Sequence, residues 1–472
     1  MLFNSVSFMI FLPVVFTLFW LIPHTRRWMV LLVASYYFYM SWNVKYIFLI
    51  LFTTILSYLC ALLMEKTASK RTKKLLMLLG VVLSLGILFF FKYFNFVSES
   101  LVYCLQAFSL PVHHLTLKVL LPVGISFYTF QTLSYVLDVY KGVIPAERHF
   151  GKYAVFVSFF PQLVAGPIER SKSLLPEIKK QHTCNCDNAV LGIKLIAWGF
   201  FKKLVIADNI APYIDSVYNN LRMYSGFVLI FATVLFAFQI YCDFSGYSDI
   251  AIGVAKLFDI SLMTNFKSPY FSASIKEFWT RWHISLSTWF RDYVYIPLGG
   301  NRTRHKRNVL ITFLASGLWH GAHWTFVLWG GLHGISQIAE KVLPSPIKQK
   351  SSLPWLFRVV LVFFFVCFTW IFFRANTIAD AFYIISHLFS GIENPKNYML
   401  TAWPVPWKSN ALKGCCGIVL LLCYDFVSLK ADAWRSIQRY PLAIRYSIYF
   451  GLILIILLLR AADSQQFVYF QF

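Results

Sequence analysis

Charged residues are scarce in this chain of 472 residues, and acidic residues are the scarcest of all. Only 13% of the residues are charged, with 20 Asp and Glu against 43 Lys and Arg, whereas 58% are hydrophobic. A soluble domain of this length needs far more charge to cover its surface. The composition therefore excludes an ordinary soluble protein and predicts a polytopic membrane protein.

Several familiar signatures are also missing. The chain has no Walker-type glycine loop, no dinucleotide-binding fingerprint, no HExxH motif and no Gly-x-Ser-x-Gly turn. Its nine cysteines are odd in number, and those at 184, 186, 415 and 416 lack zinc spacing, so no disulfide framework is implied. The net charge of +23 does not indicate nucleic-acid binding, because the basic residues alternate with bilayer-length apolar runs. We expect them in cytoplasmic loops and against anionic lipid headgroups.

Apolar runs are present along the whole chain and predict its membrane helices. Several are shorter than the roughly 20 residues of a straight span, so we expect tilted, re-entrant or interfacial helices among them. The sequence does not settle the number of full spans beyond about ten to twelve. The first run lacks a basic start and a cleavage site, and we expect a membrane helix there rather than a cleaved signal. The runs are 8–22, 28–42, 46–64, 75–96, 115–136, 153–164, 190–206, 227–258, 309–338, 356–373, 418–427 and 444–459. Residues 394–413 are polar and predict a loop.

Positive charge between the first runs predicts the orientation of the chain. Arg26 and Arg27 follow the first run, Lys45 lies in a short turn after the second, and a basic cluster at 66–74 follows the third. Because cytoplasmic loops carry the excess of Lys and Arg, the first and third of these connections are expected inside. The N-terminus is then expected outside.

The motif SGLWHGAHW at residues 316–324 places His320 in the middle of the run 309–338. An ionisable side chain at membrane depth usually does chemistry, and a neutral imidazole can still accept a proton. The alternative is a structural histidine bonded to a neighbouring helix. His333 lies off the His320 face, so a metal site with His320 and His323 would need a third ligand from elsewhere. The glycine pairs 317/321 and 330/334 predict close helix packing.

Residues 276–293 have the pattern of one amphipathic interfacial helix, with His283 on its buried face. His283 is interpreted either as a site residue or as a satisfied interfacial histidine, and spacing alone does not separate the two. The predicted buried face holds Trp279, Trp282, His283, Leu286, Phe290 and Tyr293, and the opposite face holds Glu277, Arg281, Ser285, Thr288 and Asp292.

Two further segments interrupt apolar runs. In FQIYCDFSGYSD at 238–249, Gln239 and Asp243 share a helix face. They are either part of a donor-binding or proton-linked site, or a polar cluster that pairs with Arg or Lys; we favour the cluster, shaping a cavity. In FFPQLVAGPIER at 159–170, prolines and a glycine break the run, as in a cavity-lining segment or an ordinary kinked helix end.

Taken together, these four segments resemble the membrane-bound O-acyltransferase (MBOAT) family, in its bacterial alginate O-acetyltransferase-like branch. The opening MLFNS and the closing FVYFQF resemble that branch too, so the resemblance covers nearly the whole chain. It implies an all-α polytopic fold, a helical bundle around a transmembrane tunnel with re-entrant and interfacial helices. It also implies a single membrane domain over 1–472, with N-terminal spans in 1–114, a catalytic core in 115–341 and C-terminal spans in 342–472.

The resemblance also implies an activity. An acyl thioester, acetyl-CoA or an acyl carrier, is expected to donate an acetyl or other acyl group to hydroxyls of an extracytoplasmic polysaccharide. A periplasmic or membrane-anchored acetyltransferase partner is expected, in the bacterial inner membrane, with no bound cofactor or metal. The matching site residues are His320 and His283 as catalytic groups, with Trp319, Trp282, Asp243, Gln239 and Ser285 against substrate.

In this interpretation His320 is the general base, a role typically worth about 10²–10⁴-fold in rate. His283 is expected to position the thioester or to polarise its carbonyl oxygen. Basic residues at 302, 304, 306 and 307 are expected either to attract an anionic donor or simply to mark the cytoplasmic side. Three alternatives stay open: D-alanyl transfer to teichoic acid by a related protein, a proton-coupled transporter using His320, Asp243 and Asp249, and a structural envelope subunit. The acceptor glycan also stays open.

Overall fold

The computed structural model describes residues 1–110, 115–117, 119, 121–164, 166–342, 354–394, 408–431, 433–462, 465 and 467–468. These residues form helices and no strand. The chain divides into two compact units. The first unit is Met1–Ile196 with Ile250–Met263, and the second is Ala197–Asp249 with Thr264–Phe472.

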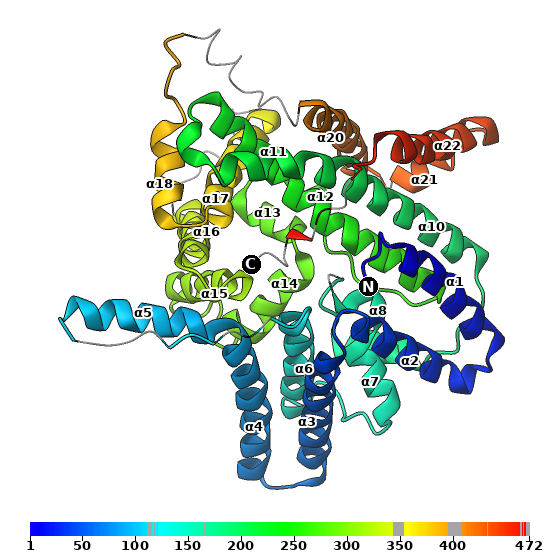
Figure 1. The fold of residues 1–472 in the computed structure, drawn as a ribbon. Coiled ribbons are helices and arrows are strands. Elements are labelled where there is room, and N and C mark those ends of the chain that lie inside the picture. The colour runs from blue at the N-terminus through cyan, green and yellow to red at the C-terminus, as the bar shows by residue number, and fades with distance from the viewer. Residues whose placement is uncertain are drawn as a thin grey trace. The chain divides into compact units, whose positions relative to one another are not determined.

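The first unit is a set of mostly short helices in which α3, α4 and α6 pack on one another (Figure 1). Serine caps begin two of them, α1 and α4; the Ser69 hydroxyl accepts the Thr72 N–H at 3.3 Å. The bounds are α1 (Val6–Leu21), α2 (Arg27–Met40), α3 (Ile47–Lys66), α4 (Lys70–Leu88), α5 (Phe94–Ala107), α6 (Ile125–Tyr140), α7 (Phe150–Ser158), α8 (Phe160–Leu163), α9 (Ser171–Lys179) and the start of α10 (Cys186–Phe200).

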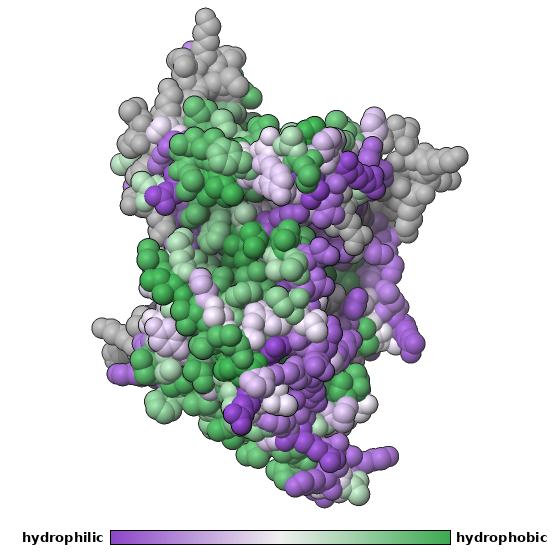
Figure 2. Space-filling view, turned by 90° about the vertical axis from the view of Figure 1, so that its right-hand side faces the viewer, coloured by the Kyte–Doolittle hydropathy of each residue, from purple (hydrophilic) through white to green (hydrophobic). Residues whose placement is uncertain are grey.

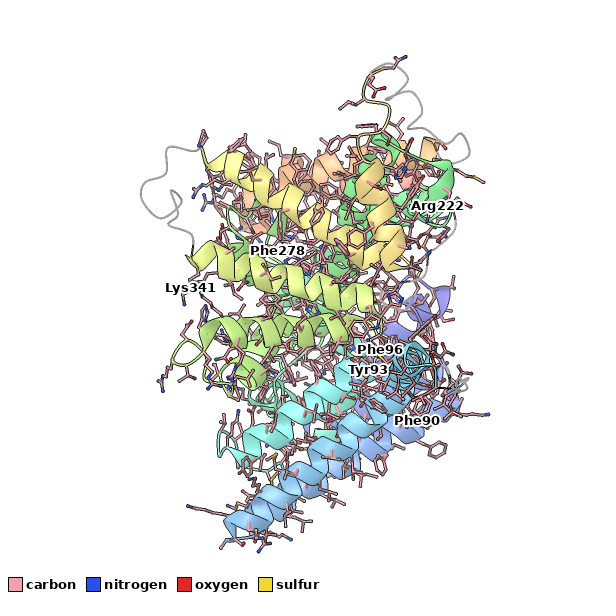
Figure 3. All side chains as sticks on the ribbon, turned by 90° about the vertical axis from the view of Figure 1, so that its left-hand side faces the viewer. Phe90, Tyr93, Phe96, Arg222, Phe278 and Lys341 are labelled. Atoms are coloured by element: carbon pink, nitrogen blue, oxygen red, sulfur yellow. The ribbon has the colours of Figure 1, made fainter. Side chains whose placement is uncertain are left out.

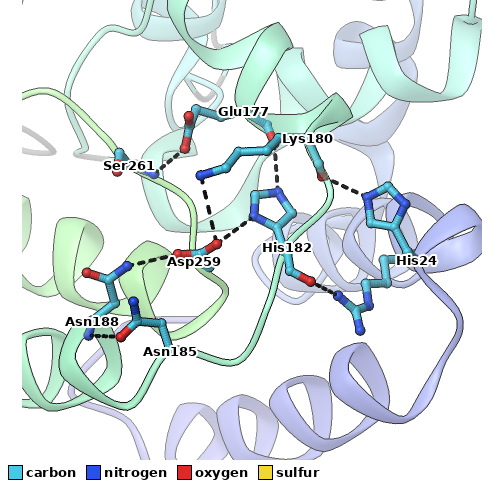
Figure 4. A network of polar contacts seen from close by, with 9 residues as sticks. His24, Glu177, Lys180, His182, Asn185, Asn188, Asp259 and Ser261 are labelled. Atoms are coloured by element: carbon cyan, nitrogen blue, oxygen red, sulfur yellow. Dashed lines mark hydrogen bonds and ion pairs between the residues drawn. The ribbon is translucent and has the colours of Figure 1, made fainter.

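A polar network ties the loop after α9 to the end of α12 (Phe227–Leu257) within the first unit (Figure 4). His182 Nδ1 lies 3.3 Å from Asp259 Oδ2, and the Asn188 amide donates to Asp259 Oδ1 at 2.8 Å. The second nitrogen of His182 binds the Glu177 carbonyl at 2.7 Å. Every polar atom of this imidazole therefore has a structural partner.

The second unit is built around two antiparallel helices, α15 and α16, with α17 packed against α16. Gly317 on α15 and Gly330 on α16 face each other closely, which confirms the predicted glycine packing. The bounds are η4 (Phe201–Ala207), α11 (Asp208–Tyr218), α13 (Ile275–Arg281), α14 (Ile284–Phe290), η7 (Arg291–Tyr295), α15 (His305–His320), α16 (Trp324–Val342), α17 (Trp355–Arg374), α18 (Ile378–His387), α20 (Lys408–Ser428), α21 (Ala433–Ile437) and α22 (Leu442–Leu459).

Among the described residues, six helices are long and apolar enough to cross a membrane. Wide hydrophobic areas, separate from hydrophilic ones, are exposed on the surface shown in Figure 2, as a lipid-facing surface requires. Of the first four predicted runs, 46–64 and 75–96 fall in such helices, whereas α1 is a shorter apolar helix. The six are Val44–Lys66, Lys70–Ala107, Phe227–Leu257, Trp355–Arg374, Ser409–Ser428 and Leu442–Leu459.

Four predicted segments differ from the structure. The run 309–338 is not one helix, because α15 ends at His320 and α16 begins at Trp324. The expected helix over 276–293 breaks at His283, and Ser285, expected on the exposed face, is buried. The run 115–136 is helical only from Ile125. Of the expected loop 394–413, residues 408–413 are helical and 395–407 lie outside the described residues.

Candidate active site

His283 lies at a break between two short helices. Its backbone adopts the left-handed conformation, with φ of 44°, which is strained for a residue with a side chain. Asn265 caps the helix that follows: its carbonyl accepts the Ile284 N–H at 3.0 Å and its side-chain oxygen accepts the Ser285 N–H at 3.2 Å. The break is thus held by one asparagine from the loop after α12.

The His283 imidazole is fully buried among aromatic rings. It lies edge-on to Phe244, with ring centroids 4.6 Å apart, and 5.9 Å from Trp319. Burial without a compensating carboxylate lowers the pKa of His283 to about 3, so the ring is neutral at physiological pH. Its Nδ1 atom lies 3.3 Å from Asn265 Oδ1, and its Nε2 atom is buried without a hydrogen-bond partner.

His320 is the last residue of α15, where the chain turns towards α16. It is 3% exposed, and its ring is edge-on to Trp329 at 5.0 Å and to Phe373 at 5.3 Å. The centroids of the His320 and His283 rings lie 6.4 Å apart. Two elements that are separate in the sequence therefore bring the two predicted catalytic histidines into one aromatic cluster.

The predicted tryptophans belong to the same cluster. Trp319 contacts His320 at 5.0 Å and is itself buried. Trp282 is fully buried and packs on Trp370 at 5.2 Å. Trp370 stacks on Trp329 at 5.7 Å, which leads back to His320. The aromatic rings exclude water around the His283 imidazole and so favour its neutral form.

Ser285 and Gln239 hold different places in the site. The Ser285 hydroxyl donates to Asn265 Oδ1 at 2.7 Å, which joins Ser285 to His283 through one amide. Gln239, on α12, is 5% exposed, and its Oε1 atom is buried without a hydrogen-bond partner.

Asp243 forms a buried ionic cluster one helical turn beyond Gln239. Its Oδ1 lies 2.8 Å from Lys203 Nζ, which also contacts Asp208 Oδ1 at 2.9 Å. Its Oδ2 accepts the backbone N–H of Val468 at 2.7 Å. The favoured interpretation of a cluster that pairs with a cation agrees with these contacts, whereas a contact of Asp243 with substrate stays a prediction.

The C-terminal segment reaches the histidine site from this cluster. Phe467 is buried against Tyr247 at 4.6 Å and against Phe244 at 5.9 Å, and Phe244 contacts His283. Asp243 thus binds the C-terminal segment whose Phe467 packs against Phe244, a neighbour of the His283 ring.

Sequence reasoning missed Asn265 and Lys203. Asn265 lies outside every apolar run and carries no motif of its own. Lys203 had a signal, because a lysine within the run 190–206 requires a carboxylate partner when buried. The carboxylates flagged on α12 were its natural partners.

A cavity of about 810 Å³ lies next to the histidine cluster within the second unit. Its wall includes Trp279, which contacts Trp329 at 5.7 Å, and Ser316, one turn before His320 on α15. Figure 3 shows Phe278 within the packed helices. It also shows Lys341, a residue of the cavity lining, at the end of α16. The basic side chains in the lining are Lys276, Arg291, His305, Lys341 and Arg358.

The other two histidines near this motif have structural partners. His333 Nδ1 accepts the Trp279 indole N–H at 3.3 Å, and its Nε2 lies 3.0 Å from the Thr369 hydroxyl. His323 contacts the Thr325 hydroxyl at 3.0 Å. In the part of the chain that the structure describes, no three His, Cys, Asp or Glu side chains are grouped so as to hold a metal ion.

The sequence is similar to known proteins over most of its length. Residues 147–379 match the model of the membrane-bound O-acyltransferase family, MBOAT. The "Probable alginate O-acetylase AlgI" of Azotobacter vinelandii is 40% identical over 396 residues, 83% of this chain and 78% of that protein. The "Peptidoglycan O-acetyltransferase" of Helicobacter pylori is 36% identical over 423 residues, 82% of this chain and 79% of that protein. The "Teichoic acid D-alanyltransferase" of Bacillus subtilis is 28% identical over 282 residues, 54% of this chain and 69% of that protein. Its described residues form helices and bring two buried histidines into one aromatic cluster. The chain belongs to the membrane-bound O-acyltransferase family.

Proposed function

We propose that this protein transfers an acetyl group from a thioester on the cytoplasmic side of the bacterial inner membrane to hydroxyls of an extracytoplasmic polysaccharide. The observation that carries the proposal is the pair of buried, aromatic-enclosed histidines whose rings lie 6.4 Å apart. Two of the relatives are named as an alginate O-acetylase and a peptidoglycan O-acetyltransferase, and each match covers over four fifths of this chain. The match to a D-alanyltransferase covers only 54% of it, so acetyl is the favoured group.

His320 is the general base of the proposed reaction. The acceptor hydroxyl gives its proton to the neutral imidazole while its oxygen bonds to the thioester carbonyl carbon. The carbon–sulfur bond then breaks, and the departing thiolate takes the proton back, which returns His320 to its neutral form. Proton transfer of this kind contributes about 10²–10⁴-fold to the rate. The water-poor aromatic wall supports the neutral starting state.

The cavity beside the histidines is the proposed donor site. Its volume of about 810 Å³ suits a cofactor-sized ligand. Lys276, Arg291 and Lys341 supply positive charge for a phosphate-bearing donor, and Trp355 supplies an aromatic face. Of the four basic residues considered in the sequence, Arg304, Lys306 and Arg307 line a smaller neighbouring hollow of about 530 Å³ together with Lys341.

The remaining predicted residues have graded roles in this proposal. Trp319 and Trp282 form the apolar wall near the reacting atoms, and Gln239 offers a buried acceptor oxygen. Ser285 and Asp243 act through the groups they bind. We further propose that the N-terminus lies outside, and that a periplasmic or membrane-anchored partner completes transfer to the sugar.

The test measures ester-linked acetate on envelope and secreted glycans in a deletion strain. The strain is complemented with the wild type, His320→Ala, or the control His387→Ala, which changes a histidine of α18 stacked on Tyr383. Membrane protein levels are matched. Acetate is expected to return with the wild type and the control but not with His320→Ala. Equal restoration by His320→Ala would remove His320 as the base. If the wild type restores ester-linked D-alanine instead of acetate, the acyl group is wrong. If it changes no ester, acyl transfer itself is wrong.

A further inference from the structure

We propose that Asn265 is a positioning residue that fixes which nitrogen of His283 carries the proton, so that His283 presents a hydrogen-bond-accepting nitrogen to the substrate. The inference rests on the proposed acyl transfer and deepens it. It gives Asn265 a role that no sequence motif suggests. It also narrows the role of His283, which we first expected either to position the thioester or to polarise its carbonyl oxygen.

The orientation of the Asn265 amide is determined by its neighbours. The Ser285 backbone N–H can only donate, and it lies 3.2 Å from one amide atom of Asn265, which must therefore be the oxygen. The other amide atom lies 3.2 Å from the Ser248 hydroxyl and donates to it. A flipped amide would set two donors against each other at Ser285.

The amide oxygen in turn determines the tautomer of His283. Oδ1 of Asn265 lies 3.3 Å from His283 Nδ1, and an oxygen acceptor requires a proton on the nitrogen it faces. A neutral imidazole carries only one such proton, so Nε2 bears a lone pair. The ring is fully buried, and Nε2 has no hydrogen-bond partner. A buried acceptor without a partner costs free energy that a substrate donor recovers on binding.

His333 provides the contrast within the same unit. Its Nδ1 accepts the Trp279 indole N–H, and its Nε2 faces the Thr369 hydroxyl, whose own proton goes to the Val366 carbonyl at 2.8 Å. Both nitrogens of His333 are thus used within the fold. A buried histidine in this protein can be fully satisfied, and His283 is not.

The consequence for the chemistry is specific. A neutral nitrogen with a lone pair cannot donate to the carbonyl oxygen or to the oxyanion that develops there. It can accept an O–H of the acceptor or an N–H of the thioester arm.

The test compares Asn265→Asp, Asn265→Ala and the control Ser248→Ala in membranes of the deletion strain with protein levels matched, so that any acetyltransferase partner is present. The assay follows transfer from acetyl-CoA to added mannuronate oligosaccharides across pH 4 to 9. Asn265→Asp keeps the oxygen that accepts from both His283 and Ser285, so His283 retains its tautomer. The rate of transfer stays within about threefold of wild type at high pH. Its carboxylate raises the pKa of His283, so the acid limb of the pH profile moves up by about one to three pH units. Asn265→Ala loses tenfold or more at every pH, as losses of orienting partners typically cost about 10–100-fold. Ser248→Ala follows the wild-type profile.

If Asn265 is purely structural, Asn265→Asp loses as much activity as Asn265→Ala at every pH, because it buries a charge. That result overturns the proposal. The substrate that donates to Nε2 is identified by whether His283→Gln raises the KM of acetyl-CoA or of the oligosaccharide. Nitrogen-15 NMR of histidine-labelled protein, assigned with His283→Gln, reads the tautomer directly. If the wild type transfers no acetate, the proposed function fails, whereas a proton on Nε2 of His283 refutes the role of Asn265 whatever the activity.

Discussion

Replacing Lys203 by methionine is expected to destabilise the second unit strongly. The side chains of Lys203 and Asp243 are 2% and 1% exposed, and Asp208 is 1% exposed. Both carboxylates lie within 2.9 Å of the ammonium, which also donates to the Gln465 carbonyl at 3.1 Å. Methionine keeps the length of the side chain and removes the charge, so two carboxylates stay buried together without their cation.

The magnitude follows from the burial. Removing one partner of a buried ion pair costs about 3–5 kcal/mol, because the remaining charge cannot reach water. Since each 1.4 kcal/mol is a factor of about ten, the folded-to-unfolded ratio falls by about two to four orders of magnitude. Asp243 keeps the backbone N–H of Val468 as a donor and Asp208 keeps that of Gln465, but the cation that both carboxylates contact in this cluster is gone.

The neighbouring lysine supplies a matched control. Lys202 pairs with Asp249 at 2.7 Å, but the Asp249 side chain is 22% exposed, so water partly compensates its loss. Thermal unfolding in detergent is therefore expected to rank the wild type first, Lys202→Met next and Lys203→Met last. The triple variant Lys203→Met, Asp208→Asn, Asp243→Asn removes all three charges and should recover much of the loss. Equal midpoints for the two lysine variants, or no recovery in the triple variant, would refute the account of this cluster.

Two further predictions concern the pH dependence of the first unit and the α15–α16 contact. Burial raises the pKa of Glu169 to about 7. The hydrogen bond that its carboxylate accepts from the Met263 N–H lowers the pKa and so offsets part of this rise. Because the folded state holds this proton more tightly than the unfolded state, stability is full below about pH 4.5 and falls by about 3 kcal/mol as pH rises to 7. Thermal unfolding from pH 4.5 to 8 should show this slope in the wild type and lose it in Glu169→Gln; an unchanged slope contradicts the assignment. Gly330→Val would force apart α15 and α16, whereas Gly331→Ala meets only ordinary contacts, so size-exclusion profiles should show aggregation in the first variant alone.

The sequence alone singled out the two histidines, but it did not predict the residues that surround them. Their catalytic roles stay predictions. His320 and His283 were found from motif resemblance and from the cost of an ionisable group among apolar residues. The helix around His320 was mistaken for a single span because Gly321 and Ala322 are as apolar as their neighbours. Hydropathy does not register a turn made of small apolar residues. The glycine pairs predicted close helix packing without naming the partner, and in the structure Gly317 packs against Gly330 of the next helix.

Polar partners were predicted less well than apolar positions. The Asp243 cluster was anticipated as a pairing with a cation, but the cation itself, Lys203, lies in a different run and was counted with its apolar neighbours. Asn265 carries no periodic signal at all, because loop residues are placed by tertiary contacts rather than by a helix or strand period. Long-range side-chain hydrogen bonds are the part of the site that a single sequence does not encode visibly.

The break at His283 explains why a continuous helix could not have built this site. In an α-helix, residues two apart point about 200° away from each other, so His283 and Ser285 would face opposite sides. The sequence pattern accordingly assigned Ser285 to the exposed face. With His283 in the left-handed conformation, the Nδ1 of His283 and the hydroxyl of Ser285 both reach the same oxygen of Asn265, at 3.3 Å and 2.7 Å. Backbone strain at this one residue, of about 1–3 kcal/mol, is therefore what allows a single amide to hold both the His283 ring and the helix that follows it. His283→Gly would relax this strain, but it would also remove the imidazole. The strain lies at the same residue as the imidazole, because only a non-helical backbone at His283 lets the ring reach Asn265.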